Sequence, residues 1–480
     1  MKVIVLLTLL TACLCSKFHI NTETNMFIDP DGRESFFRGY NVVYKRFPFY
    51  PILDHFDSNL SFSREDMELL NDMGMNIIRL GIQWPALEPQ RGQYNITYLN
   101  IMKDLVKRMA EYNLYALLDF HQDNLSPMFC GEGIPLWATL PDLESPDRDF
   151  PMPLTSPWVT GPDKVPTDEQ CSKYDWAMYT ITEAASSAYQ SLYKNRNGTL
   201  DAFASFWYRV ATEFKDYENV MGYDLINEPF AGDVTHHPTL WLPGVADKEN
   251  LAPVYEVLSA AIRKADPEAL IFFESTTWSD FRVGFDQVPG GDQYRNRSVL
   301  SYHYYTPPQF SVHQLWVARM NDLKRLKCGG MLTEFDISPD RMDNFVEIFS
   351  SSTHFKQSWI GWEYKPYVRI TGFGRSVFND DGTINQPLVK MVSQTWAQSV
   401  AGTITHQTFD FKNGTYELVY DVNANCKLPT VVYVSRERYY KNKPVVKIEG
   451  GVYKEQGKNY IHIKNEIGSK QVKLLITTPI

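Results

Sequence analysis

Short apolar segments rich in β-branched and aromatic residues alternate with helical patterns over most of the chain, which predicts repeated strand and helix units. The expected strands are 36–43, 76–81, 114–120, 220–226, 269–275, 299–305, 330–335 and 359–364. Between them, Ser63 and Asp66 have the pattern of a capping box before 64–72, and apolar residues recur at helical spacing in 98–112 and 251–265. Eight such strands predict an α/β fold, a TIM (β/α)8 barrel, with its active site at the C-terminal ends of the strands.

Two parts of the chain depart from this alternation. The connection 122–199 is much longer than an ordinary loop, and it is apolar without a regular period, which favours an ordered lid over a flexible tether. A second insertion covers 230–245. After about residue 400, segments that alternate between apolar and polar positions predict a small antiparallel β-sandwich. Its expected strands are 416–422, 430–434, 444–449, 460–464 and 472–477. We therefore expect a barrel domain over 17–400 and a sandwich over 401–480 that packs directly against it.

The first residues have the pattern of a secretion signal. Lys2 precedes the apolar stretch 3–10 and small residues follow, so 1–16 are predicted to be a cleaved signal peptide. Residues 10–13 also resemble a bacterial lipoprotein box, but acceptor triplets for N-linked glycans favour a eukaryotic secreted glycoprotein. These triplets begin at Asn59, Asn95, Asn197, Asn296 and Asn413. We expect the protein to be secreted, lysosomal or in a digestive lumen.

Cysteines remain at Cys130, Cys171, Cys328 and Cys426 after the predicted signal. Such an even number suits an oxidising compartment, and it allows three disulfide pairings. We expect Cys130 to pair with Cys171, within the long connection, and Cys328 to pair with Cys426, which would join the two domains. A zinc site is the alternative, but no Cys-x-x-Cys or His-x-x-x-His spacing supports it.

Composition and charge exclude several classes of protein. Apolar residues make up 44% of the chain, so it can bury a large core and is not expected to be disordered. Lys and Arg total 47 against 57 acidic residues, a net charge of −10, and no basic run interrupts the sequence. Binding to nucleic acid, or to anionic lipid through a polybasic patch, is therefore not expected.

Two carboxylates follow predicted strands on opposite sides of the barrel. Glu228 lies in Asn227-Glu228-Pro229 after 220–226, and Glu334 lies in Thr333-Glu334-Phe335 at the end of 330–335. Glycoside hydrolysis requires one carboxyl group that protonates the departing oxygen and one ionised group that attacks the anomeric carbon. Either glutamate alone is typical of a solvated loop, but the pair at two strand ends favours a catalytic site.

Together with their neighbours, these residues resemble glycoside hydrolase family 5. The matching positions, in strand order, are Arg79, His121, Asn227, Glu228, His303, Tyr305, Glu334 and Trp362. The resemblance implies that Glu228 is the acid/base, that Glu334 is the nucleophile and that Arg79 supports it. It also implies contacts with the sugar. The residues that would make them are His121, Asn227, His303, Tyr305 and Trp362. It implies no cofactor or metal.

Within that family the chain most resembles the endoglycoceramidases, which cut the bond between oligosaccharide and ceramide in glycosphingolipids. The segments Asp119-Phe120-His121-Gln122-Asp123 and 131–137 carry this resemblance. It implies that Asp123 and Lys45 hold the glucose next to ceramide, with Arg46 as the alternative to Lys45. The partners implied are a glycosphingolipid substrate, a lipid micelle or membrane surface, and an activator protein.

The reaction implied is a two-step hydrolysis with retained configuration, which needs carboxyl groups about 5 to 5.5 Å apart. Arg79 and Tyr305 are expected to keep Glu334 ionised, and its charge is expected to raise the pKa of Glu228. Two alternatives remain open. One is a retaining β-glucanase or β-glucosidase acting on soluble glucans, glucosylceramide or steryl glucosides, and the other is a non-catalytic protein that binds carbohydrate or lipid.

Overall fold

A computed structural model describes most of the chain after the predicted signal. The described residues are 17–141, 165–277, 281–306, 311–337, 342–367, 376–441 and 443–479. The expected signal peptide 1–16 lies outside them, as does 142–164, the central part of the long connection. Among the helices of the described residues, none is long and apolar enough to cross a membrane.

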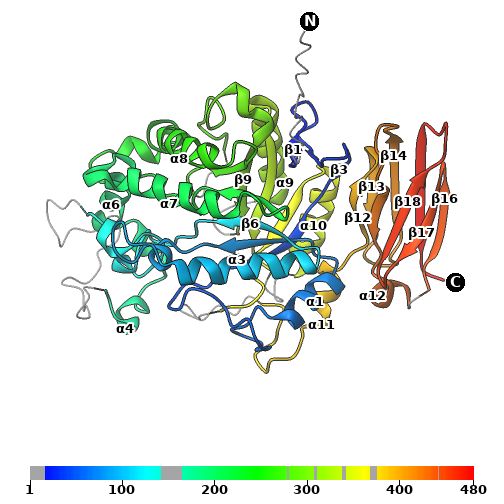
Figure 1. The fold of residues 1–480 in the computed structure, drawn as a ribbon, viewed down its shortest axis with the longest axis horizontal. Helices are drawn as coiled ribbons and strands as arrows, with labels where there is room; N and C mark the ends of the chain where they lie inside the picture. The colour runs from blue at the N-terminus through cyan, green and yellow to red at the C-terminus, as the bar shows by residue number, and fades with distance from the viewer. Residues whose placement is uncertain are drawn as a thin grey trace, which may run out of the picture.

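Eight parallel strands close into a barrel, as the sequence pattern predicts (Figure 1). They are β4 (Arg38–Val42), β5 (Ile77–Gly81), β6 (Tyr115–Asp119), β7 (Val220–Asp224), β8 (Leu270–Glu274), β9 (Ser298–Tyr304), β10 (Gly329–Phe335) and β11 (Ser358–Gly361). Strands that follow one another in the chain pair in parallel, and β11 pairs with β4 to close the ring. All eight predicted strands are confirmed, with ends that differ by at most three residues.

Helices surround the barrel and cover its outer face (Figure 1). Those within the barrel domain are α1 (Arg64–Asp72), α2 (Trp84–Leu87), α3 (Ile96–Glu111), α7 (Thr199–Phe214), α8 (Ala252–Ala265), α9 (Val312–Leu326), α10 (Met342–His354) and α11 (Gln386–Val392). The predicted capping box at Ser63 and Asp66 is present at the start of α1. In the described residues between β8 and β9 the connection carries only the short 3₁₀ helix η6 (Asp292–Arg297).

The long connection after β6 is ordered where the structure describes it, but it contains only short helices before α6. They are η1 (Pro127–Phe129), η2 (Leu136–Ala138), α4 (Asp168–Cys171) and α5 (Ala177–Thr180), and α6 (Glu183–Tyr193) follows them. Segments of three or four residues are too short to produce a hydrophobic period, which explains the absence of one in the sequence. Trp137 packs edge-on against Trp84, so this connection contacts the barrel helices.

A disulfide joins Cys130 to Cys171 across 41 residues of this connection. The second expected disulfide is wrong, because Cys328 and Cys426 are both free thiols. Cys328 is buried at the head of β10, inside the packing of the barrel wall. Cys426 lies in the turn after β14 (Tyr416–Val422), beside Gly32. The two cysteines therefore belong to separate parts of the fold.

The C-terminal region forms two antiparallel sheets, as predicted, but the sandwich begins earlier than residue 401. One sheet has the order β1-β2-β3-β12-β15-β18-β17 and the other β13-β14-β19-β16. The first sheet includes three strands from the start of the chain: β1 (His19–Ile20), β2 (Phe27–Ile28) and β3 (Glu34–Ser35). The other strands, with one short helix, are β12 (Trp396–Val400), β13 (Gly402–Phe409), β15 (Thr430–Tyr433), α12 (Arg436–Tyr440), β16 (Val445–Glu449), β17 (Gly451–Gln456), β18 (Tyr460–Asn465) and β19 (Gln471–Thr477).

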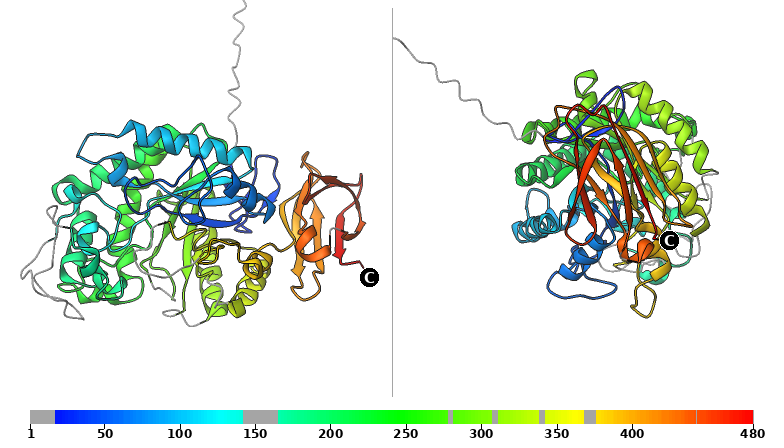
Figure 2. Two further views of the ribbon diagram at one scale, coloured as in Figure 1. Left: turned by 90° about the horizontal axis from the view of Figure 1, so that it is seen from below. Right: turned by 90° about the vertical axis from the view of Figure 1, so that its right-hand side faces the viewer.

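The sandwich lies at the N-terminal end of the barrel strands. The chain passes from β3, which pairs with β12, into the barrel strand β4 within three residues. Ile20 and Phe27 from the first strands pack with Phe37, Ile77 and other residues that fill this end of the barrel. Figure 2 shows the two sheets beyond one end of the barrel. The opposite end, where the strands have their C-termini, is left to the connecting loops.

Candidate active site

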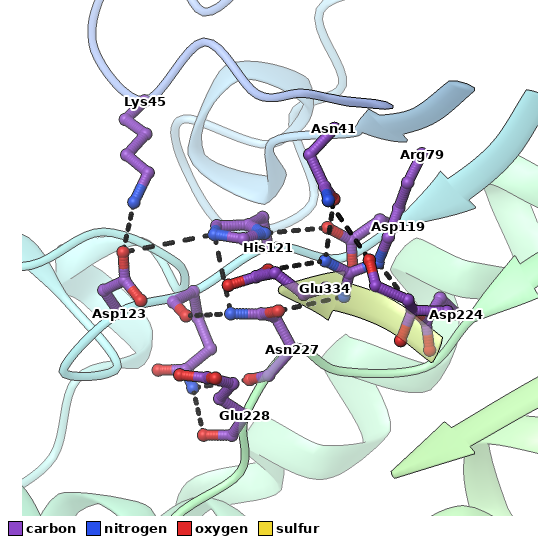
Figure 3. A network of polar contacts seen from close by, with 12 residues as sticks. Asn41, Lys45, Arg79, Asp119, His121, Asp123, Asp224, Asn227, Glu228 and Glu334 are labelled. Atoms are coloured by element: carbon purple, nitrogen blue, oxygen red, sulfur yellow. Dashed lines mark hydrogen bonds and ion pairs between the residues drawn. The ribbon is translucent and has the colours of Figure 1, made fainter. Parts of the chain in front are cut away.

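The residues singled out in the sequence converge at the C-terminal ends of the barrel strands. His303 and Glu334 belong to β9 and β10, and Glu228 and Trp362 follow β7 and β11 within a few residues. Parallel strands of a barrel end on the same face, so side chains from distant parts of the chain meet there. Figure 3 shows two of them, Glu228 and Glu334, close to the side chains of Arg79, His121 and Asn227.

Arg79, in the middle of β5, is the centre of the charge network. Its guanidinium group is fully buried and contacts three carboxylates (Figure 3). Nη2 lies 2.9 Å from Asp119, Nε lies 2.8 Å from Asp224, and Nη1 lies 3.3 Å from Oε2 of Glu334. A planar guanidinium group can hold several carboxylates in fixed directions, which an ammonium group cannot. Arg79 therefore fixes the position of Glu334 relative to two neighbouring strands.

Two asparagines extend this network. Arg79 donates hydrogen bonds to Oδ1 of Asn41 at 3.1 Å and to Oδ1 of Asn227 at 2.9 Å. The Nδ2 group of Asn41 donates to the backbone carbonyls of Thr333 and Gly361, so it ties β4 to the two strands beside the site. Because the oxygen of Asn227 accepts from Arg79, the amide nitrogen of that side chain is directed toward His121 and donates to the backbone carbonyl of Gln122 at 3.1 Å.

Glu334 is almost completely buried, with a relative exposure of 5%. The hydroxyl group of Tyr305 donates a hydrogen bond to its Oε1 at 2.6 Å. Burial raises the pKa of Glu334 to about 7, although the charge of Arg79 and the hydrogen bond from Tyr305 act in the opposite direction. Desolvation of the carboxylate thus opposes Arg79 and Tyr305, and the expectation that these two residues keep Glu334 ionised stays a prediction.

Glu228 is held through its backbone as well as its side chain. Gln122 donates hydrogen bonds from Nε2 to the carbonyl of Asn227 at 2.6 Å and to that of Glu228 at 2.9 Å. The amide of Glu228 donates to Oε2 of Glu274 at 2.9 Å. Its carboxylate lies 2.8 Å from Nδ1 of His303. Burial lowers the pKa of His303 to about 4, so its ring is neutral near pH 7.

The separation of the two glutamates follows from their contacts with His303. Nδ1 of His303 lies 2.8 Å from Oε1 of Glu228 and 4.0 Å from Oε1 of Glu334, so these two oxygens are at most about 7 Å apart. Carboxyl groups about 5 to 5.5 Å apart are typical of retaining glycosidases, and about 6.5 to 9.5 Å is typical of inverting ones. The two glutamates therefore share one cleft, and this upper limit is compatible with the separation in a retaining glycosidase.

A second cluster lies at one side of this pair, around Lys45. Its ammonium group contacts Asp123, lies 2.8 Å from Glu132 and lies 4.8 Å from the ring centroid of Trp362. Burial acts to lower the pKa of Lys45, but the two carboxylates raise it above its usual value. Arg46, the alternative to Lys45, instead pairs with the exposed Asp168. Of the two neighbouring cations, only Lys45 reaches the site.

His121 connects the two clusters. Its Nδ1 lies 2.8 Å from Asp119, and its ring stacks on Trp362 with a centroid distance of 5.0 Å. Nε2 lies 4.0 Å from Asp123 and 3.5 Å from Nδ2 of Asn227. Burial and the charge of Lys45 hold the pKa of His121 well below its usual value. A neutral ring at this position can exchange hydrogen bonds with sugar hydroxyl groups.

Comparison with known families agrees with this geometry. Residues 45–367 match the model for the cellulase family, glycosyl hydrolase family 5, and residues 395–476 match the glycoside hydrolase family 5 C-terminal domain. The chain belongs to glycoside hydrolase family 5. It is therefore a glycosidase, and both the barrel and the β-sandwich are characteristic of this family.

Two endoglycoceramidases are similar to most of this family 5 chain. An endoglycoceramidase of Hydra vulgaris is 47% identical over 88% of this chain and 81% of its own length. An endoglycoceramidase of Cyanea nozakii is 44% identical over 88% of this chain and 85% of its own. The solved structure of endo-glycoceramidase II from Rhodococcus sp. with ganglioside GM3 superposes with a TM-score of 0.74 at 21% identity. That superposition covers 94% of this chain and 99% of the other, and it bears on the fold alone.

Two groups of side chains in this family 5 site could provide metal ligands. His121, Asp123 and Glu132 form one group, and Glu228, Glu274 and His303 form the other. In the first group the ammonium of Lys45 already lies against both carboxylates, so a cation is supplied by the chain itself. The prediction that the enzyme needs no metal or cofactor stays a prediction.

Several residues of the site were not assigned a role from the sequence. They are Asn41, Asp119, Gln122, Glu132, Asp224 and Glu274, and all are buried. The available signal was a polar side chain inside or directly after an otherwise apolar strand segment, as with Asp224 in 220–226 and Glu274 in 269–275. Such a residue is costly to bury without partners, so it indicates a site.

Proposed function

We propose that this family 5 protein is an endoglycoceramidase, a retaining endo-β-glycosidase that hydrolyses the bond between the oligosaccharide and ceramide of glycosphingolipids. The observation that carries the proposal is the placement of Glu228 and Glu334 within about 7 Å of each other around His303. The identity of 44–47% to endoglycoceramidases over most of the chain supports the substrate class.

In the first step, the carboxylate of Glu334 attacks the anomeric carbon while Glu228 gives its proton to the ceramide oxygen. This step requires that, of Glu228 and Glu334, Glu228 carries the proton and Glu334 is ionised. Arg79 and the hydroxyl group of Tyr305 then stabilise the negative charge of Glu334. A covalent sugar ester of Glu334 forms, and ceramide leaves as the alcohol.

In the second step, Glu228 acts as a base and removes a proton from a water molecule that attacks the same carbon. Two displacements retain the configuration of the sugar. A neutral His303 ring 2.8 Å from Glu228 can accept a hydrogen bond from the acid form or donate one to the carboxylate. The same contact therefore serves both roles of Glu228. Esterification of Glu334 removes its charge and so lowers the pKa of Glu228 for this step.

The Lys45 cluster is suited to hold the sugar next to the cleaved bond. Asp123 and the ammonium of Lys45 offer acceptors and donors to hydroxyl groups, and Trp362 offers an aromatic face. Asn227 directs its amide nitrogen into the same space. These roles for Lys45, Asp123 and Trp362 are part of the proposal.

Exposed apolar side chains on loops at the mouth of the barrel support contact with a lipid micelle or membrane surface. Phe47, after β4, is 87% exposed, and Trp241, Leu242 and Phe281 on the loops after β7 and β8 are also exposed. Two alkyl chains need apolar cover when they leave a bilayer or micelle, and such side chains provide it. An activator protein that presents the lipid remains a further proposed partner.

We also propose that the protein is a secreted or lysosomal glycoprotein, or acts in a digestive lumen. The Cys130–Cys171 disulfide supports an oxidising compartment. The acceptor asparagines Asn59, Asn95, Asn197, Asn296 and Asn413 are all exposed to solvent.

Product analysis tests the proposed function. Purified protein is incubated in detergent with gangliosides, glucosylceramide and soluble β-glucans, and Glu334→Gln is the inactive control. Release of intact oligosaccharide and free ceramide by the wild type alone supports the proposal. Cleavage of only β-glucans, or of only monoglycosylated ceramide, would show that the substrate is wrong, and no cleavage of any glycoside would favour a binding protein.

A further inference from the structure

Glu274 ends the fifth barrel strand, β8, and the family resemblance assigns it no role. Its side chain is only 4% exposed. One carboxyl oxygen, Oε2, accepts the backbone N–H of Glu228 at 2.9 Å, and the other, Oε1, lies 3.5 Å from Nδ1 of His303. Glu274 therefore contacts both the backbone of the acid/base residue and the ring that faces its side chain.

Glu228 needs such support because its backbone is unfavourable. Its φ angle is +39°, in the left-handed region, which costs about 1–3 kcal/mol in a residue other than glycine. A conformation of this kind persists where surrounding groups fix it. The carbonyl of Glu228 is fixed by Gln122, and its amide by Glu274. Loss of either contact would let the chain relax and turn the Glu228 side chain away from the cleft.

We propose that Glu274 is a positioning residue for the general acid, holding the amide of Glu228 so that its carboxyl group points at the departing oxygen. This inference rests on the proposed function for the role of Glu228. It goes beyond that function because it assigns the orientation of the Glu228 carboxyl group to a residue on the neighbouring strand β8.

The surroundings of Glu274 favour its protonated form. Burial, the charge of Glu228 and the charge of Asp224 raise its pKa well above the usual value, and Arg79 acts in the opposite direction. On its other side, the hydroxyl group of Tyr255 donates to the backbone carbonyl of Glu274 at 2.6 Å. A neutral carboxylic acid can fix Glu228 without adding another negative charge beside Glu334.

A misdirected acid has a signature that general damage to the protein does not have. Ceramide is a poor leaving group and needs protonation, whereas 2,4-dinitrophenolate leaves without it. The value of kcat/KM reports the steps up to formation of the glycosyl-enzyme, so a defect in the acid lowers it for ceramide glycosides and spares it for aryl glycosides. The ratio of the two values is independent of how much enzyme is correctly folded.

The experiment compares Glu274→Ala and Glu274→Gln with the wild type on lactosylceramide and 2,4-dinitrophenyl β-lactoside. We expect Glu274→Ala to lower kcat/KM on lactosylceramide about 100-fold and on the aryl lactoside less than about threefold, since a general acid contributes about 10²–10⁴-fold. Glu274→Gln should retain most of both activities, because its amide oxygen can accept the same N–H.

Glu34 provides a matched control elsewhere in the molecule. It is also 4% exposed, and its Oε2 accepts a backbone N–H, that of Ile404, at the same distance of 2.9 Å. Glu34→Ala should leave the ratio of the two kcat/KM values unchanged. Three results would overturn the inference. Glu274→Ala could lose kcat/KM equally on both substrates, it could lose none on either, or Glu274→Gln could lose activity on lactosylceramide as selectively as Glu274→Ala.

Failure of the proposed function gives a different result. In that case the wild type itself releases no ceramide, although it hydrolyses the aryl lactoside. Octyl β-lactoside, whose alcohol is also a poor leaving group, then replaces lactosylceramide in the same comparison. The selectivity of Glu274→Ala can thus be measured whether or not the natural substrate is a glycosphingolipid.

Discussion

At the scale of single residues, carboxyl groups outnumber cations in the site. The carboxyl groups belong to Asp119, Asp123, Glu132, Asp224, Glu228, Glu274 and Glu334, and the cations are Arg79 and Lys45. Burial raises the pKa of Asp119 to about 6 and that of Glu132 well above its usual value. The site therefore retains protons that separate carboxylates would lose, and a glycosidase needs such a proton for its acid.

Glu334→Gln should make the protein more stable above pH 7. The folded protein holds the proton of Glu334 up to about pH 7, whereas the unfolded chain loses it near pH 4.5. The folded state therefore binds more protons in this window, and wild-type stability falls as the pH rises through it, by up to about 3 kcal/mol. Glutamine does not ionise, so the variant does not lose this stability as the pH rises. Thermal unfolding at pH 4.5 and pH 8 should show a higher Tm for the variant at pH 8 only.

The matched control for this prediction is Glu23→Gln, which changes an exposed glutamate on the turn after β1. It should leave the Tm unchanged at both pH values. A Glu334→Gln protein that gains stability equally at pH 4.5 and pH 8 would contradict the linkage, because the gain would then have no connection with ionisation.

Lys45→Met should weaken substrate binding more than it slows the chemical step. The substitution keeps the length of the side chain but leaves Asp123 and Glu132 facing each other without a cation. We expect KM for a short glycosphingolipid to rise about tenfold, in line with the loss of one or two hydrogen bonds to the sugar. Steady-state kinetics with lactosylceramide measures this change.

Arg46→Met is the control for Lys45→Met, since the two residues are adjacent. Its only described ion pair, with Asp168, is exposed and lies outside the site, so KM should change by less than about twofold. Equal effects of the two substitutions would mean that Lys45 does not contact the sugar.

At the scale of elements, the sequence predicts every strand of the barrel because each is a short apolar run between turn residues. It does not predict β17, whose residues after Gly451 are all exposed. An edge strand with no buried face lacks the alternation on which the prediction depends. The catalytic glutamates are predictable from their motifs. Glu274 stands out in the sequence only as a polar residue in an apolar strand, and its role is not predictable, because it depends on the backbone of Glu228, which no sequence pattern displays.

The Cys130–Cys171 disulfide should stabilise the connection after β6. It closes a loop of 41 residues, and a crosslink of this size contributes about 2–4 kcal/mol by restricting the unfolded chain. We expect Cys171→Ser to lower the Tm and to speed proteolytic cleavage between α4 and β6. Limited proteolysis followed by mass spectrometry locates the cut.

Cys426→Ser is the matched control for the disulfide prediction, because Cys426 is a free thiol in a turn of the sandwich. It should change neither the Tm nor the cleavage pattern. If Cys426→Ser lowered the stability as much as Cys171→Ser does, the disulfide pairing would differ from the one described.

At the scale of the whole molecule, the sandwich and the active site lie at opposite ends of the barrel. The sandwich contacts the end of α1 through Arg438 and contacts α10 through Phe411, and none of its described residues takes part in the site. In the described structure it covers the N-terminal end of the barrel. Stability and catalysis should respond separately to changes at this interface.

Asp72 allows this separation to be tested. At the end of α1 its carboxylate pairs with Arg438 at 2.6 Å and Lys458 at 3.0 Å, and its backbone carbonyl accepts a hydrogen bond from Tyr433 at 2.6 Å. Asp72→Ala removes the carboxylate contacts of a partly buried group, so we expect a loss of about 1–3 kcal/mol in stability and a lower Tm. The value of kcat/KM on lactosylceramide, measured well below the Tm, should stay within about twofold of the wild type. A large loss of activity in a folded Asp72→Ala protein would show that the sandwich influences the site across the length of the barrel.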